Sequence, residues 1–393
     1  MNYSDLINKC KKEWNCDTLM DGSNANQYMK IPFSSPMLNY ATYGGIPRNK
    51  LTEFLGKPNG GKTSTALDIC KNAIKIFSQE YIDKLNHLKE LAAKGDKAAY
   101  VQIAEVEEQG RKKVLYIDLE HGYDSRWGKI IGINPEDIDV MQPPDIAADD
   151  LLQKILEIIE TGQVGLIVID SIPSLVPRAV LEKKIGERTV AALAGLMTTF
   201  CYKVIPLLTR YGTTMIFINQ LRDNMENPYV INTPGGEAIK YYSILRIHFS
   251  QGKPVDFLGN ELPQSTENPA GYIINAKLIK QKGAPFDRKL GTYYLMTQTG
   301  IRPDYDFAQL AIKQYGIIKK SGAWYSFIDP YTGEIMHDEN NTVIKVNGMA
   351  KVYDYLQSNK EYYDKLCKYI VDDINGKDPE MDVAENSKED LLL

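Results

Sequence analysis

The chain reads GKPNGGKT at residues 56–63, and this stretch decides the fold. A short apolar run at 51–55 precedes it, and an amphipathic segment at 64–77 follows it. The glycines therefore lie between a predicted strand and a predicted helix, which is the setting that a phosphate-binding loop requires. A glycine-rich turn that matches the pattern by chance is the alternative, and both flanks disfavour it.

Each part of this loop has a role in binding a nucleoside triphosphate. The glycines allow successive backbone amides to point at a phosphate, and the start of the helix adds the positive end of its dipole. Lys62 would reach the β- and γ-phosphates, and the Thr63 hydroxyl would coordinate Mg²⁺. We expect ATP to be bound by Gly56, Lys57, Pro58, Asn59, Gly60, Gly61, Lys62, Thr63 and Ser64.

Two apolar strands predicted further along the chain end in polar residues. The run at 166–169 ends at Asp170, which is the expected position of the acid that holds Mg²⁺, usually through water, opposite Thr63. The run at 214–218 leads to Gln220. This glutamine would either contact the γ-phosphate or satisfy the backbone of a loop.

A third apolar strand, at 114–117, ends at Asp118 and is followed by Glu120 and His121. Ligands bind at the carboxyl ends of parallel strands, so a carboxylate just past such an end faces the nucleotide. Glu120 is thus well placed to hydrogen-bond a water for in-line attack on the γ-phosphate. Asp118 and His121 are the alternatives, although Asp118 is better explained as the end of the strand.

Length and composition limit what surrounds this site. At 393 residues and 43% hydrophobic, the chain is long enough for one large α/β core with one or two appendages. It begins with a polar, charged segment, and we expect no apolar run near the ~20 residues that cross a bilayer. The five scattered cysteines show no CxxC pairing, which disfavours disulfides and zinc. We expect a cytoplasmic protein without a membrane segment.

The sequence predicts four parts and one insertion. A short amphipathic helix in residues 1–30 would pack on its own core or on a neighbouring subunit, and the ATPase core follows at 31–302. Within the core, the insertion at 78–113 reads as a helical hairpin with arms at 80–93 and 97–108. Residues 303–370 form a small α/β domain with helices predicted at 304–318 and 351–370 and strands predicted at 323–327 and 342–346.

Residues 371–393 are predicted to be an acidic, disordered tail. They hold eight acids and two lysines, which gives this segment a charge of −6. Because the whole chain has a net charge of −5, the remaining residues carry +1. The tail would either improve solubility or compete for a basic surface of the protein.

In order and identity, these pieces resemble one family, the bacterial and phage RecA recombinases. The similarity runs from about residue 31 to about residue 370 and is interrupted by the hairpin. It rests on GKPNGGKT at 56, YIDLEHGYD at 116, LIVIDSIPSLVP at 166, IFINQLR at 216, TPGGEAIKYYSILRI at 233, IKQKGAPF at 279 and SGAWYSF at 321.

The resemblance implies a role for each matching residue. Glu120 would activate water, and Gln220 would sense the γ-phosphate and couple it to the second DNA-binding loop. Asp124 would hold adenine and Trp127 would stack on it. Lys280 and Lys282 would reach the γ-phosphate of ATP bound to the adjacent subunit, so hydrolysis would depend on filament formation.

Two loops are expected to face DNA, at about 182–190 and 221–234. Their cations would neutralise phosphates, an aromatic residue could stack on bases, and glycines would let the backbone approach a strand. The alternative is two mobile polar loops. The expected DNA-binding residues are Lys183, Lys184, Arg188, Arg222, Tyr229, Gly235 and Gly236.

The resemblance implies an α/β fold with a RecA-type P-loop core and an ATP- and Mg²⁺-dependent recombinase. It would form filaments on single-stranded DNA, pair them with homologous duplex DNA, and act in recombinational repair and the SOS response. Possible further partners are single-strand-binding and loader proteins. Two alternatives stay open: another RecA-fold motor such as a hexameric helicase, and a nucleotide-gated DNA-coating protein with little turnover.

Overall fold

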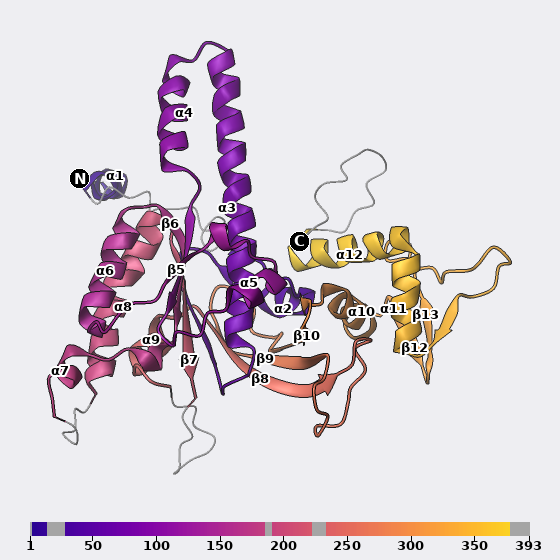
Figure 1. Ribbon diagram of the computed structural model, residues 1–393. Coiled ribbons are helices and arrows are strands. Elements are labelled where there is room, and N and C mark those ends of the chain that lie inside the picture. Colours follow the sequence, from indigo (N-terminus) through magenta and orange to yellow (C-terminus); the bar gives the residue numbers. More distant parts are fainter. Residues whose placement is uncertain (1, 14–27, 185–190, 222–232, 378–393) are drawn as a thin grey trace.

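The structure is a computed structural model that describes residues 2–13, 28–184, 191–221 and 233–377 (Figure 1). Within them, the centre is a nine-stranded sheet in the spatial order β11-β10-β9-β8-β3-β7-β6-β4-β5. Its strands are β3 (Leu51–Gly56), β4 (Lys113–Asp118), β5 (Asp139–Met141), β6 (Val164–Asp170), β7 (Thr214–Gln220), β8 (Leu245–Val255), β9 (Gly271–Gln281), β10 (Leu290–Met296) and β11 (Gly300–Ile301). This sheet confirms the predicted α/β fold class.

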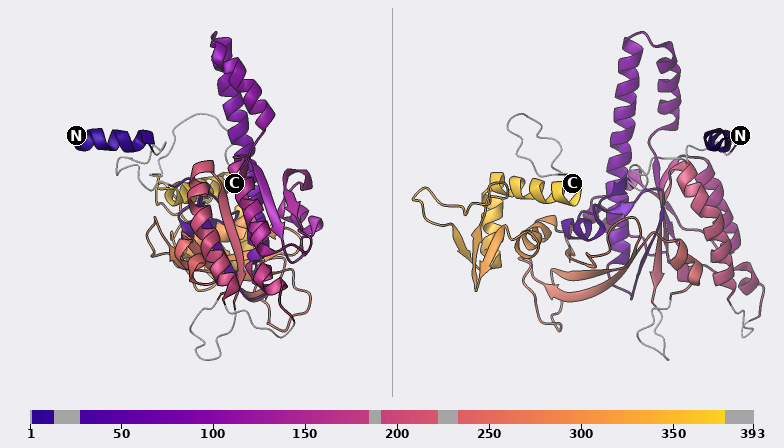
Figure 2. Two further views of the ribbon diagram at one scale, coloured as in Figure 1. Left: turned by 90° about the vertical axis from the view of Figure 1, so that its left-hand side faces the viewer. Right: turned by 180° about the vertical axis from the view of Figure 1, so that it is seen from behind.

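The six strands from β8 to β5 run parallel, so their carboxyl ends meet at one edge of the sheet. Strands β3 and β6 are buried along their whole length, and such strands need cover on both faces. On one face, Phe54 and Val168 belong to the cluster that packs under α3 (Lys62–Ala93). On the other, Ile167 belongs to the cluster under α6 (Ala148–Glu160) and α8 (Ala192–Tyr211) (Figures 1 and 2).

The remaining strands of the sheet, β9 to β11, run antiparallel to their neighbours. Short elements connect the rest of the core. These are β1 (Lys30–Ile31), β2 (Ile46–Pro47), α2 (Pro36–Thr42), α5 (Ser125–Ile131), α7 (Arg178–Leu181), α9 (Glu237–Tyr242) and the 3₁₀ turns Pro135–Asp137 and Ile172–Ser174. The N-terminal helix α1 (Tyr3–Glu13) stands apart from the body in both views of Figure 2.

Helix α3 is longer than the sequence analysis predicted. The hairpin arm expected at 80–93 is a direct continuation of the helix that starts at the phosphate loop, so α3 spans 32 residues. No glycine or proline interrupts it, and Leu85 and Leu88 are covered by Val106 of the returning helix α4 (Lys97–Gln109). The hairpin projects from the edge of the sheet opposite the carboxyl ends of the parallel strands (Figure 1).

The C-terminal part consists of α10 (Pro303–Lys313), a small sheet of β12 (Ile318–Ser321), β13 (Trp324–Phe327) and β14 (Lys345–Asn347), and two helices, α11 (Met349–Ser358) and α12 (Lys360–Ile374). Two helix predictions are wrong here. The helix at 304–318 ends at Lys313, because Gly316 adopts a left-handed φ of 65° and Ile318 begins a strand. The helix at 351–370 is two helices that meet at Asn359.

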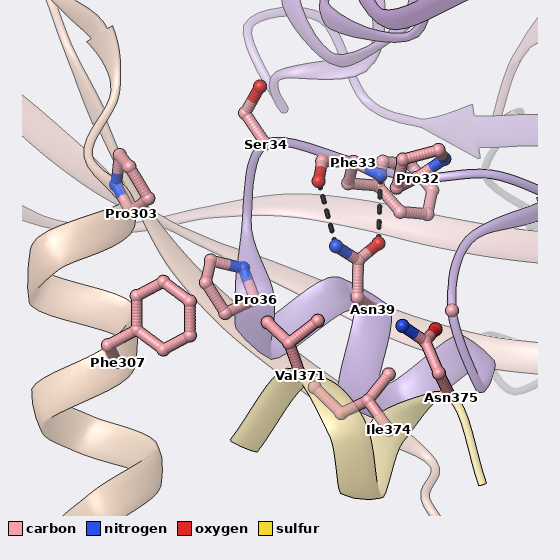
Figure 3. Close-up of a pocket in the computed structure, with 11 residues that line it drawn as sticks. Pro32, Phe33, Ser34, Pro36, Asn39, Pro303, Phe307, Val371, Ile374 and Asn375 are labelled. Carbon is pink, nitrogen blue, oxygen red and sulfur yellow. Dashed lines mark hydrogen bonds between the residues drawn. The ribbon is translucent and has the colours of Figure 1, made fainter. Parts of the chain in front are cut away.

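The acidic tail begins later than residue 371. Helix α12 runs on to Ile374, which is buried, as is Ile370 one turn earlier. Val371 and Ile374 line a cavity of about 40 Å³ against α2 and α10 (Figure 3). Asn39 of α2 shapes this junction by hydrogen bonding to the amide and the carbonyl of Phe33, each at 2.8 Å. Apolar spacing therefore keeps 371–374 in the folded part of the chain, and residues 378–393 lie outside the described ranges.

The expectation that no apolar run approaches 20 residues is wrong for α8. This helix has 20 residues and is apolar enough to span a bilayer by length and composition. However, its residues Met197, Phe200, Val204 and Leu208 are buried in the core against the sheet. We therefore interpret α8 as a helix that packs one apolar face against the sheet.

Candidate nucleotide site

The phosphate-binding loop lies where the sequence predicts it, between the end of β3 at Gly56 and the start of α3 at Lys62. Gly61 has a φ of 91°, which glycine adopts at little cost. Side chains are also excluded at the two earlier glycines, because a Cβ on Gly56 or Gly60 would lie 2.2 or 3.0 Å from the carbonyl oxygen of Phe249. The sequence GKPNGGKT thus fits a loop that passes close to β8.

Lys62 is held by the loop that it belongs to. Its side chain is buried, and its Nζ donates a hydrogen bond to the carbonyl oxygen of Lys57 at 2.8 Å. Burial lowers the pKa of Lys62, while Asp170 and Glu120 oppose that shift. The ammonium therefore lies between the loop backbone and two carboxylates, in the position from which it can contact phosphate oxygens.

Thr63 and Asp170 come together as expected for a magnesium site. The Thr63 hydroxyl donates to Asp170 Oδ2 at 2.9 Å, and the Tyr116 hydroxyl donates to the same oxygen at 2.5 Å. Burial raises the pKa of Asp170, the two hydroxyl donors lower it, and Glu120 and Asp118 raise it. A hydroxyl and a carboxylate are hard oxygen ligands that suit Mg²⁺.

Across the described part of the chain, no group of three or more His, Cys, Asp or Glu side chains could hold a metal ion. A site with two protein oxygens fits Mg²⁺, because this ion keeps several waters and is usually bound together with substrate phosphates. Thr63 and Asp170 would hold it here.

Glu120 follows β4 and is exposed at the same edge of the sheet. Its Oε1 accepts hydrogen bonds from the Ser171 hydroxyl and, at 3.0 Å, from Gln220 Nε2. Three strand ends thus meet at one carboxylate, because β4, β6 and β7 are neighbours that run parallel. Gln220 was expected to contact either a phosphate or a loop backbone, and in this structure it contacts Glu120.

The two alternatives to Glu120 have other surroundings. Asp118 is buried, and its carboxylate accepts hydrogen bonds from the amides of Gly122 and Tyr123 and from Gln142 Nε2. Burial opposes ionisation of Asp118, but these hydrogen bonds outweigh it and lower the pKa. Asp118 therefore shapes the turn after β4. His121 is exposed and has a φ of 52° in that turn.

Asp124 and Trp127 lie at the start of α5. Asp124 caps this helix by accepting a hydrogen bond from the Arg126 amide, and its carboxylate also pairs with the Arg126 guanidinium at 2.8 Å. The indole Nε1 of Trp127 donates to the Ser64 hydroxyl at 3.2 Å. Trp127 is thereby fixed beside the first turn of α3, next to the phosphate loop.

Lys280 and Lys282 lie away from the phosphate loop of their own chain. The strand register pairs Lys280 with Arg246, and Arg246 with Glu53, three residues before Gly56. This separation is about 10 Å along the strand and about 10 Å across two strands. The Lys280 ammonium instead donates to the carbonyl oxygens of Lys240 and Tyr241 at 2.6 and 2.8 Å, and the Lys282 side chain is exposed.

Of the residues expected to bind DNA, Arg188, Arg222 and Tyr229 lie outside the described residues. Lys183 and Lys184 are exposed beyond α7.

Gly235 and Gly236 have φ values of 88° and 78°, in the left-handed region that favours glycine. A Cβ on Gly235 would lie 2.5 Å from Ile239, and one on Gly236 would lie 2.7 Å from the Cβ of Ala194. Packing inside the protein is therefore sufficient to require glycine at both positions.

Two partners of the site, Tyr116 and Ser171, were not predicted from the sequence. Tyr116 lies within the apolar strand before Asp118, and Ser171 directly follows Asp170. A tyrosine in an otherwise aliphatic buried strand is a usable signal, because a buried hydroxyl generally needs a hydrogen-bond partner.

This combination of a phosphate loop, a strand-end aspartate beside Thr63 and a parallel sheet defines the protein as a P-loop NTPase with a RecA-type core. Comparisons with known proteins narrow the class. A family model described as the RecA N-terminal domain matches residues 89–302. The chain is 32% identical over 307 residues to Protein RecA of Thermus thermophilus, with 76% of this chain and 75% of that protein covered.

Two other relatives extend the match. Protein RecA of Thermus aquaticus is 29% identical over 87% of this chain and 84% of its own length. The chromosomal Protein RecA of Lactococcus lactis is 28% identical over 98% of this chain and 87% of its own length, an alignment too complete to omit the phosphate loop. The chain belongs to the RecA family, the ATP-dependent recombinases of recombinational DNA repair. These matches do not favour the helicase or DNA-coating alternatives.

Proposed function

We propose that the protein is a DNA-stimulated, Mg²⁺-dependent ATPase that forms a homo-oligomeric filament on single-stranded DNA and pairs it with homologous duplex DNA. One observation carries this proposal. The phosphate loop and Glu120 lie at the carboxyl ends of the parallel strands, while Lys280 and Lys282 lie two strands across and nearer the opposite edge. A site that needs both sets of residues is completed only between two copies of the chain.

Each residue then has a defined task in hydrolysis. The loop amides and Lys62 bind the phosphates, and Glu120 orients the attacking water, with its carboxylate fixed by Ser171 and Gln220. Bound between Thr63 and Asp170, Mg²⁺ would neutralise charge on the β- and γ-phosphates. Trp127 would stack on adenine and Asp124 would hold it, for which Asp124 must exchange part of its pairing with Arg126.

The neighbouring copy would contribute Lys280 and Lys282 to the γ-phosphate. A heterologous contact of this kind repeats from copy to copy and forms a ring where the rotation closes or an open helical filament where it does not, and we propose the filament. The helix α1, which stands apart from its own body, is suited to pack on the adjacent subunit. We propose that residues 1–30 serve assembly, that the core at 31–302 hydrolyses ATP, and that the C-terminal part from residue 303 captures duplex DNA.

For DNA contacts we propose Lys183, Lys184, Arg188, Arg222, Tyr229, Gly235 and Gly236. The cations would neutralise phosphates, and binding would weaken as salt increases. The cytoplasm is the proposed location, with single-strand-binding and loader proteins as further partners.

ATP hydrolysis with and without single-stranded DNA, measured on the wild type and on Glu120→Gln, tests the function. We expect hydrolysis that DNA stimulates strongly, and filaments on DNA with ATP under the electron microscope. Glu120→Gln should keep the filaments and lose turnover. A wild-type protein that stays monomeric with ATP and DNA, or hydrolyses ATP equally fast without DNA, would contradict the proposal. A DNA-coating protein would show filaments with negligible turnover in both variants.

A further inference from the structure

A buried polar network crosses the middle of the sheet beside the nucleotide site. Glu53 of β3 is fully buried and lies between Asn219 of β7 and Arg246 of β8. Its Oε1 accepts a hydrogen bond from Asn219 Nδ2 at 2.9 Å, and its Oε2 accepts one from Arg246 Nε. Glu53 is the only charged residue in the otherwise apolar run at 51–55. Both of these hydrogen bonds go to neighbouring strands and neither goes to the phosphate loop.

One end of the network reaches the second DNA-facing loop. Asn219 directly precedes Gln220, whose side-chain amide contacts Glu120. The side chains of these two consecutive residues therefore contact different glutamates. The Asn219 Nδ2 also donates to the carbonyl oxygen of Pro234 at 3.0 Å. Asn219 therefore ties the last residue of the loop at 221–234 to the strand that starts it.

The other end of the network reaches the strand that carries the two lysines. Arg246 is paired in register with Lys280 across β8 and β9. Lys280 in turn donates to the last carbonyls of α9, the helix that follows Gly235 and Gly236. A continuous chain of contacts thus joins Pro234, Asn219, Glu53, Arg246 and the Lys280 segment.

Stability alone is a poor explanation for this arrangement. Replacing a buried ion pair by apolar residues of similar volume is often neutral or stabilising, because desolvation offsets the attraction between the charges. Among the described residues, Arg246 Nη2 has no hydrogen-bond partner, so the guanidinium is incompletely satisfied. A network that is costly to bury yet links two functional segments is better suited to transmit a change of position.

We propose that Glu53 is a positioning residue that couples the second DNA-facing loop to the subunit-bridging strand. A shift of Pro234 on DNA binding would move Asn219 and Gln220 together, and Glu53 would transmit the shift through Arg246 to the strand of Lys280. DNA binding would thereby change the existing contact between Gln220 and Glu120 and align Lys280 for the neighbouring nucleotide in one step. This inference rests on the proposed DNA-stimulated hydrolysis and adds the residue that links its two halves.

The test compares hydrolysis with and without single-stranded DNA in three variants. Glu53→Gln removes the charge at nearly constant shape. The double variant Glu53→Leu with Arg246→Met removes both charges together and avoids an unpaired buried ion. The control is Asp68→Asn, because Asp68 is a similarly buried carboxylate, bonded to the Ser34 amide at 2.7 Å and to Lys71 at 2.8 Å, that contacts no part of the network.

We expect Glu53→Gln to bind ATP and DNA normally and to keep its DNA-independent rate, while kcat with DNA falls by about fivefold or more at unchanged KM for ATP. The double variant should keep a melting temperature near that of the wild type and still lack stimulation. Asp68→Asn should lower the melting temperature and retain stimulation.

Three results would overturn the inference: full stimulation in Glu53→Gln, recovery of stimulation in the double variant, or equal loss of stimulation in Asp68→Asn. A wild type that DNA does not stimulate would instead overturn the proposed function as a whole. The two failures are therefore distinguishable.

Discussion

The hydrogen bond from Tyr116 to Asp170 gives the most quantitative prediction for the metal site. The variant Tyr116→Phe removes a hydroxyl that lies 2.5 Å from Asp170 Oδ2 and leaves the ring in place. Both residues are buried, and a hydrogen bond to a charged group in such a site contributes about 1.5–3 kcal/mol. Loss of this bond should therefore raise the pKa of Asp170, because the ionised carboxylate loses that stabilisation.

The sign of the effect follows from the role of the carboxylate. Burial already raises the pKa of Asp170, and the Tyr116 hydroxyl counteracts that rise by stabilising the charged form. Without the hydroxyl, Asp170 would become protonated at higher pH and would hold Mg²⁺ less well. The acid limb of kcat/KM, measured at a fixed subsaturating Mg²⁺ concentration, should therefore move to higher pH.

Tyr123→Phe is the matched control for this experiment. The Tyr123 ring lies 5.7 Å from that of Tyr116, but its hydroxyl is buried without a hydrogen-bond partner among the described residues. Its removal should leave the pH profile where it is. An acid limb that stays in place in Tyr116→Phe, or that moves equally in Tyr123→Phe, would refute the reasoning.

Three further variants test other parts of the account. Lys62→Ala should abolish nucleotide binding measured with a fluorescent ATP analogue, and retained affinity would remove Lys62 from the phosphate site. Glu120→Gln should lower DNA-stimulated turnover by about 10²- to 10⁴-fold with nucleotide affinity unchanged. Near-normal turnover would mean that another group orients the attacking water. Asp118→Asn should cost about 1–3 kcal/mol of unfolding free energy at pH 7. Because the folded-state pKa of Asp118 lies below its ordinary 3.8, this stabilisation is present above that value and lost as the pH falls through the folded-state pKa. The unfolding free energies of the wild type and Asp118→Asn, measured by thermal unfolding, should therefore differ at pH 7 and converge at acid pH. A difference that stays constant with pH would contradict this assignment.

Local patterns predicted most of the strands and helices that carry the proposed nucleotide site. The strand before Gly56, the helix after Gly61 and the carboxylates at the ends of β4 and β6 are encoded by residues within a few positions of each other, so alternation and glycine spacing are sufficient. The convergence of these strand ends at Glu120 then follows from the parallel sheet.

The partners of Glu53 could not be predicted in the same way. A glutamate in a buried strand indicates that a partner exists, but Asn219 and Arg246 lie 166 and 193 residues further along the chain. Only the order of strands in the sheet brings them together.

The predicted ends of elements were wrong where a helix stays packed beyond the point at which its sequence becomes more charged. The charged segment after Phe77 looked like a new element, yet Leu85 and Leu88 extend α3 because α4 covers them. The acidic residues after Ile370 looked like a tail, yet Ile374 is one turn further on the same buried face. In both cases, tertiary burial outweighed local polarity.

A mixing experiment tests most directly whether ATP is hydrolysed between two copies of the chain. Glu120→Gln lacks the water-orienting carboxylate, and Lys282→Ala lacks the lysine offered to the neighbour, so each variant alone should have little DNA-stimulated turnover. In a 1:1 mixture, random assembly joins an intact Glu120 to an intact Lys282 of the adjacent copy at roughly one interface in four. We predict recovery of about a quarter of the wild-type rate. A mixture no more active than its two components would contradict a shared site.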